Sequence, residues 1–371
     1  MKKLKILILI TELDVAGAEK IVYYQAKGLK EKGHDVEVAC LYGRGVMGDR
    51  IESCGIPVIY LEAKGKWDFS VLFRLRGLLK KNDYDILHCH LFHANIIGRI
   101  SAIFIPKMVV ISTTHVMEVD KIYRVRLEGL TSFLTDAYIC VSNSVREFLN
   151  DKGKIRPDKL NVVHNGINLE EFIPDKSPEQ IKRELGIEKK IIIGSVGRLH
   201  KQKGYEYLLK AAALLKKDLS DFSLLIVGDG PLKNDLVLLS KSLKIEDLVI
   251  FTGFRSDIAN ILNAIDIFVL PSVWEGFGLV VAEAMALSKP VVATNVDGVP
   301  EIVEDGVTGF IVEPENPEII AKRIKDILDN PEKMDEMGKE GRIRVEDFFT
   351  VDRMVDGVEN LYYKFSTSSD Q

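Results

Sequence analysis

The sequence predicts an α/β protein made of two doubly wound parallel sheets, each covered by helices. Short apolar runs rich in β-formers alternate with amphipathic stretches along the whole 371-residue chain, which is typical of parallel strands with helical crossovers. The chain is also too long for one ordinary hydrophobic core. Residues 165–178 are rich in turn formers and separate two such alternating blocks, so we expect two domains.

Thirteen apolar runs are predicted as strands. In the first block they lie near residues 4–10, 36–41, 57–61, 85–90, 108–113, 137–141 and 160–164. In the second block they lie near residues 191–196, 222–227, 248–252, 266–270, 290–293 and 309–312. We expect domains at residues 1–168 and 169–350, and three successive helices between residues 317 and 366. The last of these helices has one apolar face that must dock on another surface.

The composition is that of a globular protein, with 46% hydrophobic and 28% charged residues. No apolar segment approaches the length of a membrane span, and the run at residues 6–10 has no cleavage signature after it, so we interpret it as a buried strand. The chain has no HExxH motif and no DxD pair at a strand end, so no protein-held metal is expected. Four scattered cysteines predict a reducing, cytoplasmic location: Cys40, Cys54, Cys89 and Cys140.

The two blocks differ in charge. Residues 1–165 hold 25 Lys and Arg against 19 Asp and Glu, a balance of +6, and the rest of the chain holds 25 against 36, a balance of −11. A basic N-terminal half suits an anionic partner, either a phosphate-bearing acceptor or the anionic inner face of a membrane. Lysines scattered over solvated helix faces explain the excess equally well. No nucleic-acid partner is expected.

The segment from Glu275 to Glu283 is the most informative of the candidate sites. A short buried strand at residues 267–270 leads into a turn with two glycines, and a helix is predicted to begin near Leu279. The first amides of a helix have no intrahelical partners and, with the helix dipole, favour phosphate oxygens. The two carboxylates flank that point and can accept hydrogen bonds from ligand hydroxyls. This pattern indicates a sugar-nucleotide site, and the alternative is a pair of ordinary solvated glutamates.

A second candidate loop, residues 194–204, leads from a strand through a glycine turn to a helix and carries Arg198 and Lys203. Arginine offers a fork of donors and lysine a point charge, so the two can converge on one diphosphate and offset the charge of a departing nucleoside diphosphate. The alternative is a pair of solvated surface cations.

The N-terminal loop at residues 11–20 is a further ligand seat, because a turn of small residues leads into a helix predicted to start near Gly17. The loop lacks the GxGxxG motif, which disfavours a nicotinamide dinucleotide.

In the second block, Gly253, Phe254 and Arg255 follow a strand and are candidates for the rim of a nucleotide-base site. Phe254 can stack on a ring, although a lone aromatic beside a strand is more often part of the core.

Histidines gather at two predicted strand ends. His115 follows the strand at residues 109–114 and can hydrogen-bond a sugar hydroxyl or polarise a reacting group. The alternative is a structural histidine with satisfied hydrogen bonds. His88, His90 and His93 crowd another strand end, where no acid or cysteine completes a ligand set. We interpret these three as lining of the crevice.

Together these segments resemble the large family of retaining glycosyltransferases called family 4 (group 1), whose GT-B fold has two Rossmann-like domains facing a central cleft. The resemblance covers nearly the whole chain. Its mark is the pair of glutamates with seven residues between them, here Glu275 and Glu283. Further motifs in the same order support it: Gly17-Ala18-Glu19, His164-Asn165-Gly166-Ile167, Gly197-Arg198-Leu199 with Lys203-Gly204, and Gly298-Val299-Pro300-Glu301-Ile302.

The resemblance implies roles by position. Arg198 and Lys203 would contact the donor diphosphate and Glu283 the nucleotide ribose. Glu275 would meet the hydroxyls of the transferred sugar, and His115 would face that sugar from the other domain. The last helix, residues 351–366, would cross back to the N-terminal domain. The remaining donor-side positions would border the base or approach sugar and phosphate: Gly253, Phe254, Arg255, Gly276, Phe277, Gly278, Leu279 and Val280.

The sequence departs from the family pattern in one loop. Ala16 and Lys20 stand where the family commonly has Gly and Arg, beside the acceptor-side residues Gly17 and Ala18. This departure concerns the acceptor side and leaves the donor half unchanged.

The resulting hypothesis is a retaining, metal-independent transfer of a hexose or N-acetylhexosamine from a nucleoside-diphosphate sugar, with a UDP-sugar expected. The acceptor would be a glycan or a lipid-linked molecule in surface polysaccharide or glycolipid synthesis. The donor is a co-substrate, and no other cofactor is expected. A nucleotide-sugar epimerase, a sugar phosphorylase and a non-catalytic nucleotide-sugar-binding protein are the alternatives, which differ in whether UDP is released from a UDP-sugar.

Overall fold

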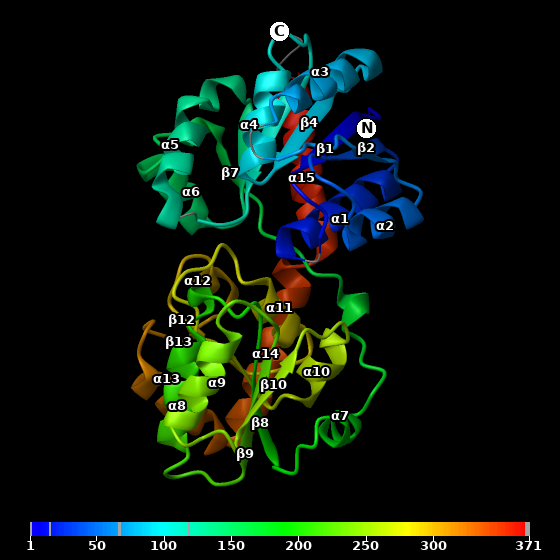
Figure 1. Cartoon of the computed structure of the whole chain (residues 1–371). Coiled ribbons are helices and arrows are strands. Elements are labelled where there is room, and N and C mark those ends of the chain that lie inside the picture. Colours follow the sequence, from blue (N-terminus) through cyan, green and yellow to red (C-terminus); the bar gives the residue numbers. More distant parts are fainter. Residues whose placement is uncertain (1, 15, 66–67, 118, 368–371) are drawn as a thin grey trace. The chain divides into compact units, whose positions relative to one another are not determined.

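The computed structural model describes residues 2–14, 16–65, 68–117 and 119–367. The chain forms two compact units. The N-terminal unit consists of residues 1–166 and 351–371, and the C-terminal unit of residues 167–350. Each unit contains one sheet with helices packed on it (Figure 1). Every strand range predicted from the sequence overlaps a strand of the structure, with bounds that differ by at most two residues.

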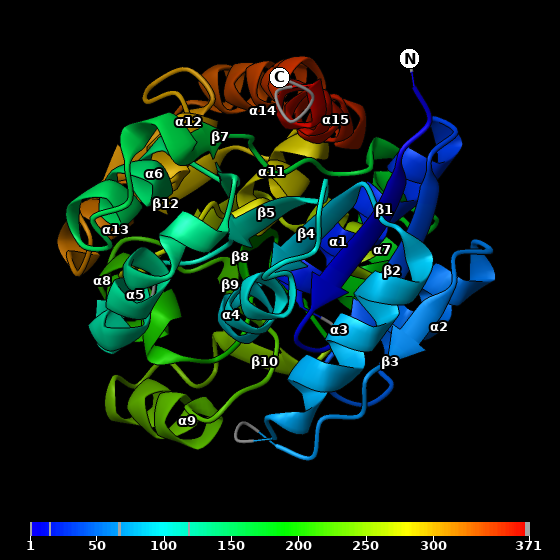
Figure 2. The ribbon, with the colours of Figure 1, turned by 90° about the horizontal axis from the view of Figure 1, so that it is seen from above.

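The sheet of the N-terminal unit has seven described strands in the order β3-β2-β1-β4-β5-β6-β7, and all its neighbours are parallel. Figure 2 shows β1 with β2 on one side and β4 on the other. The elements are β1 (Lys5–Ile10), α1 (Gly17–Glu31), β2 (Asp35–Cys40), α2 (Val46–Ser53), β3 (Val58–Tyr60), α3 (Ser70–Asn82), β4 (Ile86–His90), α4 (Phe92–Ser101), β5 (Val109–Thr114), η1 (Val119–Lys121), α5 (Ile122–Leu130), η2 (Ser132–Leu134), β6 (Ala137–Cys140), α6 (Asn143–Asp151), η3 (Pro157–Lys159), β7 (Leu160–Val162) and α15 (Val351–Thr367).

The sheet of the C-terminal unit has six described strands in the order β10-β9-β8-β11-β12-β13, again all parallel. The elements are η4 (Leu169–Phe172), α7 (Pro178–Glu184), β8 (Ile191–Val196), η5 (Lys201–Lys203), α8 (Tyr205–Leu215), β9 (Phe222–Val227), α9 (Lys233–Ser242), β10 (Val249–Gly253), α10 (Ile258–Ala264), β11 (Ile267–Leu270), α11 (Leu279–Ala286), β12 (Val291–Thr294), α12 (Val299–Ile302), β13 (Gly309–Val312), α13 (Pro317–Leu328) and α14 (Pro331–Phe348).

Local sequence explains where the C-terminal helices begin. Asn316 and Asn330 each precede a proline, and their side-chain oxygens accept the amides of Ile319 and Lys333 at 3.0 and 3.1 Å. An asparagine cap followed by proline at the first helical position is a strong start signal. Among the described residues, none of the helices combines the length and the apolar character that crossing a membrane requires.

The last helix packs on the first helix of the N-terminal unit. A Cβ atom at Gly28 of α1 would lie only 2.7 Å from Val355 of α15, so glycine allows the two helices to approach closely. The buried carboxylate of Glu359 on α15 accepts hydrogen bonds from Lys32 at 2.8 Å and lies 2.9 Å from Nε2 of His34. Close packing and charge pairing together hold α15 against this unit (Figure 1).

Replacing Tyr362 of α15 by phenylalanine is expected to destabilise the protein by about 1–3 kcal/mol. Its buried hydroxyl lies 2.7 Å from Nδ1 of His88, and the substitution leaves that nitrogen without a partner. Denaturant unfolding measures the change. Tyr363→Phe is the matched control, because that hydroxyl bonds the carbonyl of Lys2 at the surface; equal losses in both variants would contradict the explanation.

Candidate active site

The two main candidate loops of the C-terminal unit meet where the strand order reverses. From β8 the chain builds outward to β9 and β10, then crosses back to add β11 on the other side of β8. The connections after β8 and β11 therefore diverge, and ligands of open α/β sheets bind at the carboxyl ends of the strands at such a point. Residues 197–204 follow β8 and residues 271–278 follow β11.

An ion pair joins these two loops. The ammonium of Lys203 lies 2.6 Å from Oε2 of Glu275, and the side chains are only 16% and 12% exposed. The hydroxyl of Ser272 donates to the same carboxylate oxygen at 3.2 Å. The structure therefore brings together two of the residues that the sequence identified 72 positions apart. Partial burial makes this pair stronger than an exposed one, because water screens it less.

Backbone contacts hold the same two loops together. Gly204 has a positive φ of 60°, and a Cβ atom there would lie 2.0 Å from the carbonyl oxygen of Pro271. The amide of Val273 donates to the carbonyl of Gln202 at 2.7 Å. Only glycine satisfies both the conformation and the close approach at this position, so the Lys203-Gly204 dipeptide sets the geometry of the ion pair.

Asp297 is a part of the site that the sequence did not identify. Its Oδ2 accepts the backbone amide of Glu275 at 2.6 Å, and it has a positive φ of 48° in an Asp-Gly turn after β12. Burial, and then the nearby charge of Glu275, raise the pKa of Asp297 above its ordinary value, while the hydrogen bond from the Glu275 amide opposes that rise. In the sequence, the Asp-Gly dipeptide after a strand predicts a turn at this position, but it does not predict that Asp297 contacts Glu275.

Helix α11 starts immediately after the glycine turn, as predicted. Gly278 caps it with a φ of 98°, and Phe277 before it is buried with its ring centroid 5.6 Å from that of Phe349. Glu283 is half-buried on the helix. The first amides of α11, which include those of Leu279 and Val280, begin at the turn that carries Glu275. The helix start expected from the sequence thus lies beside the ion pair.

The other donor-side candidates are less constrained. Arg198 is exposed and its guanidinium bonds no other described residue. Phe254 is 65% exposed, so the alternative that it belongs to the core is wrong. Arg255 forms a two-pronged pair with Asp257 at 2.7 and 2.6 Å, directly after Gly253 at the end of β10. Phe254 therefore presents a free ring, whereas Arg255 is held by its own loop.

In the N-terminal unit, buried histidines form a ladder across β4 and the end of β5. Nδ1 of His90 lies 2.9 Å from Nε2 of His115, and the rings of His88 and His90 are 4.1 Å apart. Nε2 of His88 lies 2.6 Å from the hydroxyl of Thr113. His93 lies on α4 with its ring against Phe92 instead. His88 and His90 therefore share one strand end, with His115 as the third member, but both are fully buried, whereas the sequence predicted that they line a crevice.

Burial keeps this ladder neutral. Loss of solvation lowers the pKa of His88 to about 3 and that of His115 to about 4, and it lowers the pKa of His90 well below its ordinary value. Nε2 of His90 is buried and has no hydrogen-bond partner among the described residues. An unpartnered buried N–H is rarer than an unpartnered acceptor, so the proton of His90 belongs on Nδ1. His115 then accepts through Nε2 and carries its own proton on Nδ1.

The first turn of α1, after the N-terminal loop, contains a buried acid. Gly17 and Ala18 open α1, with Gly17 exposed, and Glu19 behind them is 3% exposed with Oε2 unpartnered among the described residues. Burial raises the pKa of Glu19 to about 7. The sequence identifies Glu19 only as part of a motif, because residue type alone does not reveal burial.

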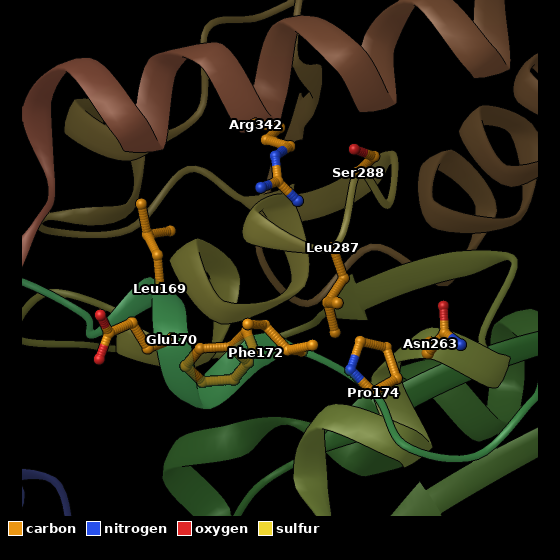
Figure 3. Close-up of a pocket in the computed structure, with 9 residues that line it drawn as sticks. Leu169, Glu170, Phe172, Pro174, Asn263, Leu287, Ser288 and Arg342 are labelled. Atoms are coloured by element: carbon orange, nitrogen blue, oxygen red, sulfur yellow. The ribbon is translucent and has the colours of Figure 1, made fainter.

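A hollow of about 480 Å³ in the C-terminal unit lies apart from these residues. Figure 3 shows Arg342 of α14 and Leu287 directed toward it, with Phe172 and Pro174 on the opposite wall. Asn263 lies in the last turn of α10, which precedes β11, and Leu287 and Ser288 connect α11 to β12, so all three lie toward the amino ends of these strands. The candidate residues follow the carboxyl ends, so this hollow is not their site. Among the described residues, no group of three or more His, Cys, Asp or Glu side chains has the arrangement of a metal site.

Comparison with known proteins places the chain in a family. Residues 177–344 match the family described as "Glycosyl transferases group 1", and residues 15–171 match "Glycosyltransferase Family 4". An uncharacterised glycosyltransferase of Methanocaldococcus jannaschii is 32% identical over 269 residues, covering 68% of each chain. The UDP-Gal:α-D-GlcNAc-diphosphoundecaprenol α-1,3-galactosyltransferase of Escherichia coli is 28% identical over 363 residues, covering 94% of each.

Solved structures agree on the fold. HepE of Anabaena, crystallised with UDP-glucose, has a TM-score of 0.87 at 23% identity and covers 96% of this chain and 99% of its own. Sucrose-phosphate synthase of Thermosynechococcus elongatus has a TM-score of 0.83 at 22% identity, covering 98% and 100%. Two parallel-sheet Rossmann-like units with these neighbours define a GT-B protein. The chain belongs to the family 4 (group 1) glycosyltransferases.

The tautomer of His115 is directly measurable. We expect histidine-selective ¹⁵N NMR near pH 7 to show Nδ1 protonated and Nε2 unprotonated in His115, because His90 donates to Nε2. His90→Phe, which removes the donor, should abolish that preference, and His90→Asn, which keeps an amide N–H near the same place, should preserve it. A His115 protonated on Nε2 in the unaltered protein would contradict the assignment.

Glu19→Gln is expected to stabilise the protein at pH 8 and to leave it nearly unchanged at pH 5. The folded pKa of about 7 lies above the unfolded value, so the folded state binds more protons between these values and stability falls as pH rises from about 4.5 through 7. Glutamine avoids this loss, which is at most about 3 kcal/mol. Thermal unfolding at the two pH values tests this, and an equal effect at both would show that ionisation of Glu19 is not responsible.

Proposed function

We propose that this glycosyltransferase moves a hexose or N-acetylhexosamine from a UDP-sugar to a glycan or lipid-linked acceptor, with retention of the anomeric configuration and without a metal. The observation that carries the proposal is the Lys203–Glu275 pair at the reversal of strand order, beside the start of α11. A cation, a carboxylate and helix-start amides at one point suit a ligand with a diphosphate and sugar hydroxyls.

The donor assignment is supported by similar proteins. HepE was crystallised with UDP, with UDP and glucose, and with UDP-glucose, and the E. coli relative is a UDP-galactose-dependent enzyme acting on a diphosphoundecaprenol-linked sugar. A capsular polysaccharide glycosyltransferase of Staphylococcus aureus is 26% identical across the whole chain. These names support a nucleoside-diphosphate sugar and an acceptor in surface polysaccharide or glycolipid synthesis.

In the proposed reaction the bond between the sugar C1 and the β-phosphate oxygen breaks while C1 bonds to an acceptor hydroxyl oxygen. The diphosphate leaves with the bonding electrons, and the acceptor proton passes to a departing phosphate oxygen. Lys203, exposed Arg198 and the first amides of α11 offset the growing negative charge. Attack on the face from which the diphosphate leaves preserves the configuration.

The carboxylates and the histidine have separate roles in this proposal. Glu275 accepts hydrogen bonds from hydroxyls of the transferred sugar, and Asp297 positions it by binding its backbone amide. Glu283 of α11 binds the ribose. The exposed ring of Phe254 stacks on the base beside Gly253. His115 contributes its Nδ1–H as a donor to a sugar hydroxyl.

A screen of UDP-, GDP- and ADP-sugars for released nucleoside diphosphate, with thermal stabilisation as a second readout, tests the donor class. We expect UDP release and stabilisation only with UDP-sugars. An epimerase would isomerise the sugar without releasing UDP, a phosphorylase would require inorganic phosphate, and a non-catalytic binding protein would be stabilised without turnover. Each of those outcomes would overturn the proposal.

Glu275→Ala is expected to lower transfer by about 10²- to 10³-fold, which is the usual effect of removing one preorganised polar group from an active site. Thermal stabilisation by UDP should persist, because the base, ribose and diphosphate contacts are retained. Glu206→Ala is the control, since that exposed glutamate of α8 pairs only with Lys210 among the described residues. Unimpaired transfer by Glu275→Ala would remove Glu275 from the mechanism.

A further inference from the structure

Helix α5 buries an acidic side chain and exposes several apolar ones. Its buried face holds Val125 and also Glu128, whose carboxylate lies 2.5 Å from the fully buried guanidinium of Arg99. Its solvent face carries Tyr123, Leu127 and Leu130, which are 63%, 39% and 74% exposed. A helix on the surface of a globular protein normally has the reverse arrangement. The exposed apolar side chains of this face are therefore suited to contact with a partner other than water.

Three of the exposed apolar side chains form one stripe along α5. Tyr123, Leu127 and Leu130 are spaced by four and three residues, which places them on the same side of the helix. Phe133 of η2 follows three residues later and is 75% exposed. We call these four side chains the α5–η2 face. A contiguous apolar patch on a protein surface marks an interaction site.

Basic residues surround this face. Residues 151–159 pack against α5, because a Cβ atom at Gly129 would come within 1.8 Å of the carbonyl oxygen of Gly153. Together, residues 119–135 and 151–159 contain seven Lys and Arg against four Asp and Glu, and one of those four acids is the buried Glu128. Asp151 pairs with Lys152 and Lys154, and Asp158 pairs with Arg156, so an excess of three positive charges remains beside the apolar side chains.

Two of these cations lie at the stripe itself. Arg126 is exposed on α5, three residues after Tyr123 and beside Leu127. The ammonium of Lys159 bonds the carbonyls of Ser132 and Thr135, which flank Phe133 in sequence, at 2.9 and 2.6 Å. The positive charge therefore reaches both ends of the apolar stripe.

The charge pattern decides between the possible occupants. Two copies of this face brought together would pair apolar side chains but would also oppose their cations, which disfavours self-association. A bilayer with anionic lipids complements both features, because apolar side chains enter the headgroup region while cations meet the phosphates. Apolar insertion with basic flanks is the usual chemistry of helices that lie on a membrane surface.

We propose that the α5–η2 face docks this protein on the surface of an anionic lipid bilayer. Tyr123, Leu127, Leu130 and Phe133 insert among the headgroups, and the surrounding lysines and arginines bind lipid phosphates. Docking on a bilayer is separate from the transfer reaction and does not depend on which donor is used. It narrows the membrane contact expected from the whole basic N-terminal half to one helix and the turn after it.

The test is sedimentation of the full chain with vesicles, without donor or acceptor. The unaltered protein is expected to bind vesicles of phosphatidylcholine with phosphatidylglycerol, to bind vesicles of phosphatidylcholine alone at least tenfold more weakly, and to be released by high salt. The variant Leu130→Ser with Phe133→Ser should bind the anionic vesicles about tenfold more weakly. Because no sugar transfer is measured, failure here leaves the proposed reaction untouched.

Phe73→Ser with Phe104→Ser is the matched control, since these side chains are 77% and 89% exposed in the same unit but lie on α3 and after α4. It should bind vesicles like the unaltered protein, and thermal unfolding checks that both variants fold. Equal binding by all three proteins, or a loss confined to the control, would overturn the proposal. So would a dimer in solution that only the Leu130/Phe133 variant dissociates, because the face would then be a self-association surface.

Discussion

The constraint on which both units depend is the parallel pairing of their strands. Parallel strands need a crossover between them, and helices then cover both faces of the sheet, so the inner strands are buried and all carboxyl ends lie at one edge. At the reversal between β8 and β11 two loops diverge and leave room for a ligand. Lys203 and Glu275 lie on these loops, and their ion pair is a local consequence of the sheet order.

The two units handle buried polar groups in different ways. In the C-terminal unit, charge is paired: Lys203 balances Glu275, and Asp297 is bonded by a backbone amide. The N-terminal unit also pairs buried charge, as Arg99 does with Glu128, but its histidines avoid charge: His90 and His115 are neutral because burial lowers their pKa values. A neutral histidine supplies a directional donor, whereas a paired lysine supplies charge that an arriving diphosphate can recruit. Both properties suit a reaction in which negative charge moves onto a leaving group.

Much of the fold was predictable, because buried parallel strands are apolar throughout and end at clear turn signals; β9, for example, is buried at every residue. The loops with Lys203 and Glu275 were predictable for the same reason. Strand order was not, since it depends on long-range pairing. The contact between His90 and His115 follows from the register that pairs His90 with Thr113, and the role of Asp297 follows from a backbone amide. Residue type predicts neither of these contacts, and it does not predict that Phe254 is exposed to solvent.

The central claim is that Lys203 and Glu275 act as one electrostatic unit toward a diphosphate, and UDP affinities of three variants, measured by calorimetry, test it most directly. Lys203→Met should weaken UDP binding by about 10- to 100-fold, because a cation is lost and the carboxylate left behind repels the ligand. Adding Glu275→Gln to Lys203→Met should restore about tenfold of that loss, whereas Glu275→Gln alone should not weaken binding. If the double variant binds UDP no better than Lys203→Met, the two side chains do not share a ligand and the account is contradicted.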